Sequence, residues 1–284
     1  MKYNYFEDIA TITEFLNMSQ LDLAQALSID RTTLFRIQTG KVTPSKSFLE
    51  KFYDYAFRKN IPLNKLKEMF WLDCMQEDEK LLFHGAKEEI VGGIDVKYGK
   101  VHHDFGQAFY AGESFEQSVS FVNNFKNSSI YILSFKDDGL SHKTFGVNQD
   151  WMFTIAYYRH ILQEYEEHPY LKKLIADCEK SDYIIAPIAD NRMYDIISQF
   201  AEGSITDEQC KHALAATNLG MQYVFKSEKS VSNIKILERC YVSQAEREHY
   251  STIRLQNSSL QESKAKMARI QYKGKGKYID ELLK

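Results

Sequence analysis

The feature that most constrains this chain is an abrupt change in hydrophobic periodicity near residue 78. Before that point apolar residues recur every three or four positions, which is the pattern of short amphipathic helices. After it, apolar strand-like segments such as residues 130–135 alternate irregularly with helical ones. We therefore expect an α+β protein with three parts. These are an all-α domain at residues 1–77, a domain of strands and helices at 78–243, and a polar, helix-favouring tail at 244–284.

Composition excludes several classes of protein. The net charge of -3 over 284 residues excludes a generally basic surface, so any contact with DNA must come from a local patch. No segment approaches the ~18 uninterrupted apolar residues of a membrane span, and the N-terminus lacks the apolar block of a signal peptide. We expect a cytoplasmic protein without a membrane partner.

Neither a metal site nor a disulfide framework is expected. The cysteines are widely separated and form no C-x-x-C pair. His102 and His103 are adjacent, and on an extended chain they point in different directions, which disfavours a shared metal ion.

Residues 17–44 carry the start and stop signals of two short helices. Ser19, with Asp22 three residues later, predicts a capping box that starts a helix with one apolar face. We expect that inward face to hold Leu21, Ala24 and Leu27.

A second helix is expected to follow after a tight turn at residues 28–29. Asp30 is predicted to cap it, Leu34 and Ile37 to face inward, and Gly40 to end it in a left-handed conformation. The start of this helix then carries outward polar and basic side chains, in the place that enters a major groove in helix-turn-helix proteins.

The segment resembles the helix-turn-helix of phage repressors, over residues 12–68 and including further helices at 47–58 and 63–71. The resemblance implies base contacts by Arg31, Thr32 and Arg36, and phosphate contacts by Gln20, Thr39 and Lys41. Such domains usually act as dimers on two half-sites, so a homodimer is expected. The alternative is a helical module that binds a protein such as an antitoxin instead of DNA.

The larger domain places polar residues beside backbone that a ligand can approach. His84 ends the apolar run 81–83 and is followed at once by Gly85. Residues 103–113 combine aromatic and small side chains, which suits stacking of a planar ring, and Tyr110 is the candidate for that contact. Taken singly, His84 and Tyr110 also fit an ordinary core role.

In combination, LLFHG at 81–85 and DFGQAFY at 104–110 resemble the first two motifs of ADP-ribosyltransferases of the histidine-tyrosine-glutamate type. The resemblance implies that NAD+ is a co-substrate. It assigns the nicotinamide ribose to His84, the carboxamide to the backbone of Gly85, and ring stacking to Tyr110. A following helical segment implicates Ser118 at the carboxamide and Phe121 on the other face of the ring.

Residues 81 to about 238 more specifically resemble a bacterial domain family of formerly unknown function within the ADP-ribosyltransferase superfamily. Its marks also include Trp151 with Arg159, the segment 182–191 and the segment 219–227. The resemblance implies a split β-sandwich with helices. It also suggests a toxin-antitoxin or phage-defence setting.

The third motif departs from the family, because Gln222 stands where a catalytic glutamate is usual. An amide accepts the same hydrogen bond but carries no negative charge, so electrostatic catalysis is weakened. Asp104 and Glu113 are the nearest carboxylates that could substitute as a base. Arg159 is expected either to pair with the NAD pyrophosphate or to form a structural ion pair, and Asp190 to orient a neighbour.

The leading hypothesis is therefore an NAD-dependent mono-ADP-ribosyltransferase, metal-free, with a DNA-binding head and a protein or nucleic-acid acceptor. The alternative is a transcription regulator whose catalytically weak domain senses NAD or ADP-ribose. The basic run at residues 273–277 is read as a flexible, solvated tail, with a contact to nucleic acid or a partner as the other reading.

Overall fold

A computed structural model describes residues 3–217 and 220–284. The chain divides into two compact units, each built from several stretches of sequence. The first contains residues 1–91, 115–134 and 236–253, and the second contains 92–114, 135–235 and 254–284. The predicted boundary at 77/78 falls between a helix and a strand of the first unit.

The first unit combines helices with strands that neighbour one another in the order β1-β3-β7. Its helices are α1 (Tyr5–Phe15), α2 (Gln20–Ala26), α3 (Arg31–Gln38), α4 (Lys46–Arg58), α5 (Leu63–Cys74) and α6 (Phe115–Val122). Its strands are β1 (Glu79–Ala86), β3 (Ser129–Lys136) and β7 (Ile234–Tyr241), the last two of which extend at one end into the second unit.

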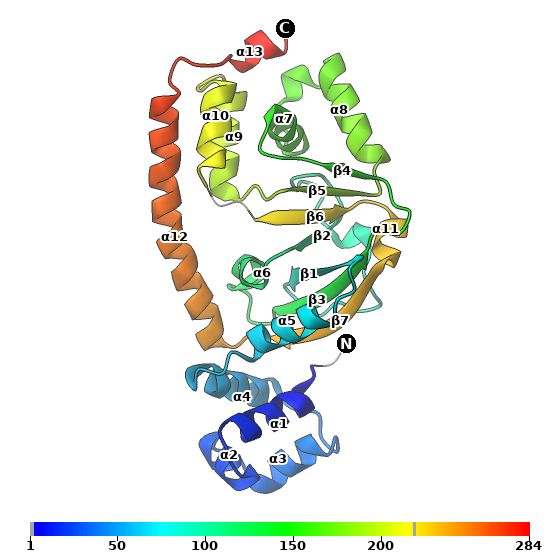
Figure 1. The fold of residues 1–284 in the computed structure, drawn as a ribbon, viewed down its shortest axis with the longest axis vertical. Helices are drawn as coiled ribbons and strands as arrows, with labels where there is room; N and C mark the ends of the chain where they lie inside the picture. The colour runs from blue at the N-terminus through cyan, green and yellow to red at the C-terminus, as the bar shows by residue number, and fades with distance from the viewer. Residues whose placement is uncertain (1–2, 218–219) are drawn as a thin grey trace. The chain divides into compact units, whose positions relative to one another are not determined.

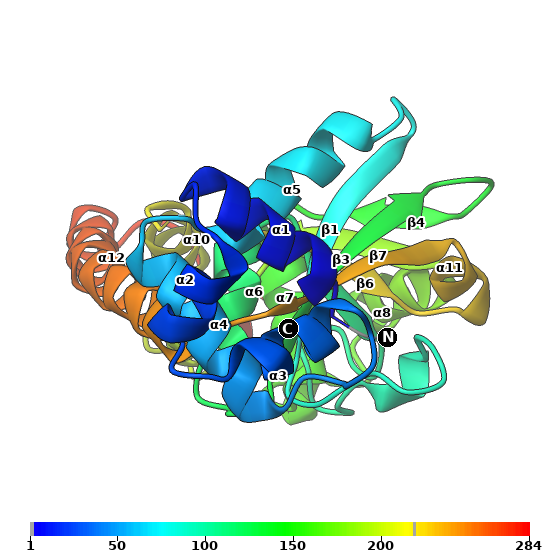
Figure 2. The same cartoon turned by 90° about the horizontal axis from the view of Figure 1, so that it is seen from below.

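The N-terminal helices form one apolar core, and α1 to α4 are seen as a group in Figures 1 and 2. The capping box between Ser19 and Asp22 starts α2 as predicted. The predicted face of α2 is wrong at one position, because Leu21 is 46% exposed and Leu23 is buried in its place. Leu23 and Leu27 lie one helical turn apart and fall on the same face, whereas Leu21 is rotated about 200° from Leu23.

The second predicted helix is present as α3, with Leu34 and Ile37 buried as expected. Gly40 has φ +70, in the left-handed region that glycine adopts without strain. Asp30 occupies the N-cap position, but its side chain makes no capping hydrogen bond, so that part of the prediction is wrong.

The second unit contains a four-stranded mixed arrangement in the order β4-β5-β6-β2. Its strands are β2 (Phe109–Gly112), β4 (His142–Thr144), β5 (Tyr183–Pro187) and β6 (Met221–Phe225). Strand β5 is parallel to β4 and antiparallel to β6, which is antiparallel to β2. Together with the first unit, this establishes an α+β protein.

Helices cover one face of these four strands and form the largest apolar core of the chain with them. They are α7 (Gln149–Tyr158), α8 (Pro169–Lys180), α9 (Asn191–Ala201) and α10 (Asp207–Ala215). The shorter elements are η1 (Val96–Tyr98), η2 (Gln163–Tyr165), α11 (Glu228–Ser232) and α13 (Ile279–Leu282). Figure 1 shows α7 beside α8, and α9 beside α10.

Helix α7 ends at a sharp turn of the chain. Its last residue is Tyr158, and His160 follows with φ +58. That left-handed residue turns the chain back, so that the amide of Ile161 donates to Ala156 O at 3.0 Å.

The C-terminal tail is ordered, which corrects the expectation of a flexible basic run. The long helix α12 (Gln244–Gln271) begins in the first unit and continues in the second. After it, the tail binds the N-terminus of α10: Thr206 Oγ1 donates to Lys275 O at 2.5 Å, and the amide of Lys277 donates to Asp207 Oδ1 at 2.7 Å. The composition suggested solvent exposure, but hydrogen bonds between the backbone of the run and side chains at a helix end hold it in place.

Candidate functional site

Tyr110 and Gln222 lie on the same face of two neighbouring strands in the second unit. In the antiparallel pair β2–β6, Tyr110 is opposite Val224 and Gly112 is opposite Gln222. Directly opposed residues in an antiparallel pair project to the same face, and residues two apart along a strand share a face. Tyr110 and Gln222 are therefore diagonal neighbours, although 112 positions separate them in the sequence.

Small residues flank Gln222 on both sides. Gly112 on β2 and Ala186 on β5 are its direct partners in the two strand pairs. This leaves room around a side chain that is only 4% exposed. Leu219, the first residue of the predicted third motif segment, lies outside the described residues.

Asp104 is the centre of a buried polar network next to Gln222. Its Oδ2 accepts from Gln222 Nε2 at 3.1 Å and from the backbone amide of Ala189 at 3.2 Å. Its Oδ1 accepts from Arg159 Nη2 at 2.5 Å and from Nε at 3.2 Å. Asp104 is 1% exposed, so these contacts compensate for the water that its carboxylate has lost.

Arg159 forms the ion pair that was one of its two expected roles. Its guanidinium also lies over the ring of Tyr194, with its central carbon 5.4 Å from the ring centroid. The pyrophosphate contact stays a prediction.

The other two candidate carboxylates have local roles. Glu113 directly follows β2, and its carboxylate forms a side-chain hydrogen bond with Tyr223. Asp190 caps α9 by accepting from the amides of Arg192 and Met193, each at 3.1 Å, and pairs with the Arg192 guanidinium at 3.0 Å. Of the carboxylates considered from the sequence, Asp104 is the one that the structure shows in contact with Gln222.

Tyr110 is held by the loop that precedes its own strand. Its hydroxyl donates to Gly106 O at 2.6 Å and accepts from the amide of Phe105 at 3.1 Å. Burial raises the pKa of Tyr110 above its ordinary value. The phenol therefore stays protonated and fixes the ring in place.

His103 lies next to Tyr110. In the sequence analysis His103 was considered only as a possible metal ligand. The two ring centroids are 4.1 Å apart at an interplanar angle of 41°. Burial lowers the pKa of His103, with Arg159 adding to the effect and the Asp104 carboxylate opposing it. A neutral imidazole thus covers part of the tyrosine ring. Its position directly before Asp104 in the motif was the signal available in the sequence.

The first unit brings the other predicted NAD-binding residues together on β1 and α6. His84 is partly buried on β1, and Ser118 Oγ of α6 donates to Phe83 O of β1 at 3.2 Å. A Cβ at Gly85 would lie 2.5 Å from Ser118 O, so the close approach of α6 itself requires glycine there. Phe121, one turn after Ser118, is 48% exposed.

The predicted DNA-contacting residues are exposed and lie in or next to α2 and α3. They are Gln20, Arg31, Thr32, Arg36, Thr39 and Lys41. Thr39 Oγ1 donates to Phe35 O at 2.9 Å, so its hydroxyl proton is used within the helix. Lys41 Nζ lies 5.9 Å from the ring centroid of the exposed Phe35.

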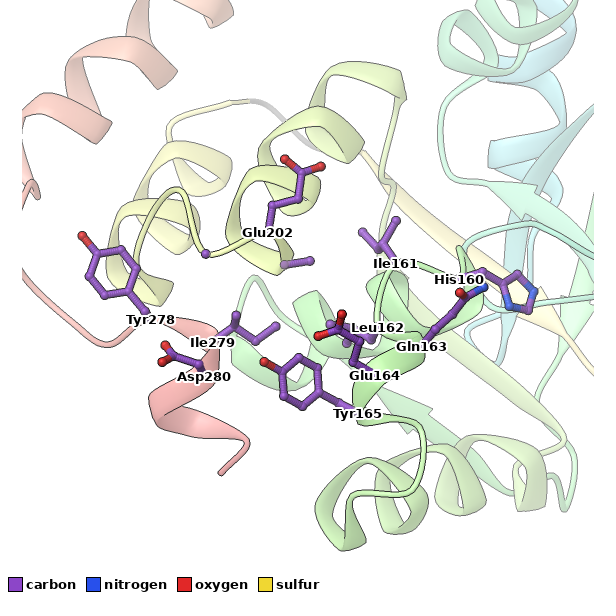
Figure 3. Close-up of a pocket in the computed structure, with 12 residues that line it drawn as sticks. His160, Ile161, Leu162, Gln163, Glu164, Tyr165, Glu202, Tyr278, Ile279 and Asp280 are labelled. Atoms are coloured by element: carbon purple, nitrogen blue, oxygen red, sulfur yellow. The ribbon is translucent and has the colours of Figure 1, made fainter.

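A pocket of about 700 Å³ in the second unit was not foreseen. Figure 3 shows its lining, which comes from the loop after α7, from the end of α9 and from α13. Carboxylates and tyrosines contribute most of the polar groups, including Glu164, Glu202 and Tyr278. None of the residues predicted to bind NAD is among those that line it.

Two searches of the described residues were negative. Within 3–217 and 220–284, no three histidine, cysteine, aspartate or glutamate side chains are grouped so that they could hold a metal ion. In the same part of the chain, no helix combines the length and the apolar character needed to cross a membrane.

Comparison with known proteins gives one match. Residues 81–236 match the model of a family described as "Protein of unknown function (DUF3990)". No curated protein and no solved structure matches the chain.

Proposed function

We propose that this chain, which belongs to the DUF3990 family, is an NAD-dependent mono-ADP-ribosyltransferase with a DNA-binding head. The observation that carries the proposal is the placement of Tyr110 and Gln222 on one face of β2 and β6. Their motifs were assigned to one NAD site from sequence resemblance alone. The register of β2 and β6 is independent of that resemblance, and it supports the assignment of both residues to one site.

The reaction would break the bond between nicotinamide and the ribose C1′ and transfer ADP-ribose to a nucleophile of the acceptor. In the second unit, Tyr110 presents a rigid aromatic ring, and Gln222 presents a hydrogen-bonding amide for a ribose hydroxyl. The resemblance assigns His84 and the backbone of Gly85 to the ribose and the carboxamide, with Ser118 and Phe121 completing the nicotinamide contacts. An ADP-ribosyltransferase-like split β-sandwich is part of the same proposal.

For the head, we propose DNA binding through α3. The support is that Arg31, Thr32 and Arg36 are exposed while the apolar residues Leu34 and Ile37 of the same helix are buried. This is the amphipathic division that a recognition helix requires. The head would repress the gene's own operon or bring the enzyme to nucleic acid, in a toxin-antitoxin or phage-defence system.

Two measurements test the enzymatic proposal. They are the release of nicotinamide from NAD+ and the transfer of labelled ADP-ribose to protein and nucleic-acid acceptors. We expect both in the wild type and their loss in His84→Ala. His142→Ala is the matched control, since His142 lies on β4 and has no assigned role. Absence of any transfer or NAD hydrolysis, with His84→Ala also leaving toxicity unchanged, would reject the proposal.

One observation favours a second candidate function, a transcription regulator that senses NAD or ADP-ribose without turnover. Gln222 is 4% exposed and its amide nitrogen is bound by protein acceptors, as in a structural network. NAD titration by calorimetry combined with product analysis separates the two: binding without nicotinamide release supports the regulator.

A further inference from the structure

The orientation of the Gln222 amide is fixed by its partners. Nε2 lies 3.1 Å from Asp104 Oδ2 and 3.2 Å from Pro187 O. A carboxylate and a backbone carbonyl only accept hydrogen bonds in these positions, so the NH2 group must be the end that faces them. Oε1 is consequently the atom of the amide left to accept a hydrogen bond from a ligand.

Asp104 is itself held rigidly. The two nitrogens of Arg159 bind one carboxylate oxygen, and the amide of Ala189 shares the other with Gln222. The four groups come from the loop before β2, the end of α7, the segment after β5, and β6. A side chain held by several such contacts is positioned more precisely than one held by a single hydrogen bond.

We propose that Asp104, anchored by Arg159, is a positioning residue that holds Gln222 with Oε1 directed to a ribose hydroxyl of NAD. This inference rests on the proposed function. Its consequence is that glutamate at position 222 is not an improvement in this chain, because two carboxylates would then meet about 3 Å apart where one hydrogen bond now exists.

A reciprocal exchange tests the link. The variants are Asp104→Asn, Gln222→Glu and the two combined, and the measurement is nicotinamide release from NAD+ as kcat, KM and their pH dependence. In the double variant the amide introduced at position 104 can donate to the carboxylate introduced at position 222, so this one hydrogen bond is restored with its direction reversed, while the contacts with the Ala189 amide and with Pro187 O are lost. Asp182→Asn is the control, since it removes a carboxylate of the same unit that binds Ser141 and Ser227 instead.

We expect each single variant to lose about 10- to 100-fold in kcat, the scale of a misplaced reacting group. The double variant should recover part of this loss relative to the weaker single one but not reach the wild type, because the Ala189 amide and Pro187 O lose their partners. Gln222→Glu should also lose activity as pH rises, because at low pH one carboxyl keeps a proton and can donate to the other. Wild type and double variant should lack this ionisation, and a purely structural role would not produce it.

Arg159→Lys provides a second test that leaves both 104 and 222 unchanged. Lysine keeps the charge but cannot supply the paired planar donors, so a partial loss of kcat is expected, with a small decrease in thermal stability because one hydrogen bond to the buried Asp104 carboxylate is lost. An active wild type whose double variant shows no recovery, with no new ionisation in Gln222→Glu, overturns this inference alone. A wild type that neither binds nor cleaves NAD overturns the proposed function as well.

Discussion

Lys67 of α5 and Glu238 of β7 form an ion pair inside the first unit, with Nζ 2.8 Å from the carboxylate and both side chains about nine-tenths buried. Lys67 also lies 2.7 Å from the Asp8 carboxylate, and Trp71 Nε1 donates to Glu238 at 2.9 Å. The N-terminal helices are thus joined to β7 through charges that have lost their water. Such a pair costs most when only one partner is removed.

Replacement of Lys67 by methionine should destabilise the protein by about 3–5 kcal/mol, because two buried carboxylates lose their common cation. Urea unfolding followed by circular dichroism measures this. Lys65→Met is the control on the same helix: Lys65 is 41% exposed and pairs with Glu68 and Glu116 at the surface, where about 0–1 kcal/mol is expected. Equal losses of unfolding free energy in the two variants would show that the buried ion pair contributes no more to stability than the exposed one.

Stability should decrease with rising pH through Glu246. Burial raises the pKa of this carboxyl to about 8, while its Asn64 hydrogen bond and Lys67 oppose the effect. Below the unfolded pKa of about 4.3 both states bind the proton; between that value and about 8 only the folded state does. The stability contributed by the protonated form is therefore lost as pH rises through this window.

The measurement is the urea midpoint of wild type and Glu246→Gln at intervals from pH 5 to about 9. Glutamine stays neutral, so the variant should have a flatter profile and gain relative stability at the alkaline end. Glu248→Gln, an exposed neighbour on the same helix, should keep the wild-type slope. A profile of Glu246→Gln parallel to that of the wild type contradicts the prediction.

DNA binding should depend on the exposed arginines of α3. Arg31→Ala combined with Arg36→Ala should abolish specific binding in a gel shift against the upstream region of the gene, because each lost base contact costs about 1–3 kcal/mol. Arg58→Ala, which removes an exposed arginine at the end of α4, is the matched control and should bind normally. If the double variant binds DNA like the wild type but loses a protein partner, the helices form an antitoxin-binding surface instead.

The docked tail can be tested through two neighbouring glycines. Gly276 has φ +84, and a Cβ there would clash with Asp207 Oδ1, which holds the Lys277 amide. Gly274 has φ +77 but no neighbour within 4 Å of its Cβ position. Gly276→Ala should therefore release the tail and speed tryptic cleavage at Lys275 and Lys277. Gly274→Ala is the control, since it adds only the cost of the left-handed backbone, about 1 kcal/mol. Identical rates of digestion in the two variants would contradict the binding of the tail to Asp207.

Local signals in the sequence predicted local structure well. The Ser19–Asp22 capping box is confirmed because its two partners are three residues apart and need no information from the rest of the chain. The predicted inward face of α2 was wrong at Leu21. A short helix with apolar residues at both 21 and 23 can be rotated to bury either one, and tertiary packing buries Leu23. The ordered conformation of the tail was not predicted because Lys277 binds Asp207, which is 70 positions away in the sequence.

The candidate site shows the same limit. Sequence motifs selected Tyr110 and Gln222 separately, and their shared face follows from a register that no local pattern encodes. Asp104 and Glu113 were both candidates for the base, and the sequence offered no ground for preferring one of them. Its contacts with Arg159 and Gln222 span 55 and 118 positions, and only the fold identifies them.

The membership of Tyr241 in the core of the N-terminal helices affects when the head can be completed during synthesis. Tyr241 lies in the same apolar cluster as Ile9, Leu34 and Phe52, and its carbonyl accepts from Asn64 Nδ2 at 2.8 Å. A ribosome makes the helices first but supplies Tyr241 only after about 240 residues have been joined. A nascent or prematurely terminated chain would therefore carry N-terminal helices whose apolar core is incomplete, and this core would reach full stability only when the chain is nearly finished.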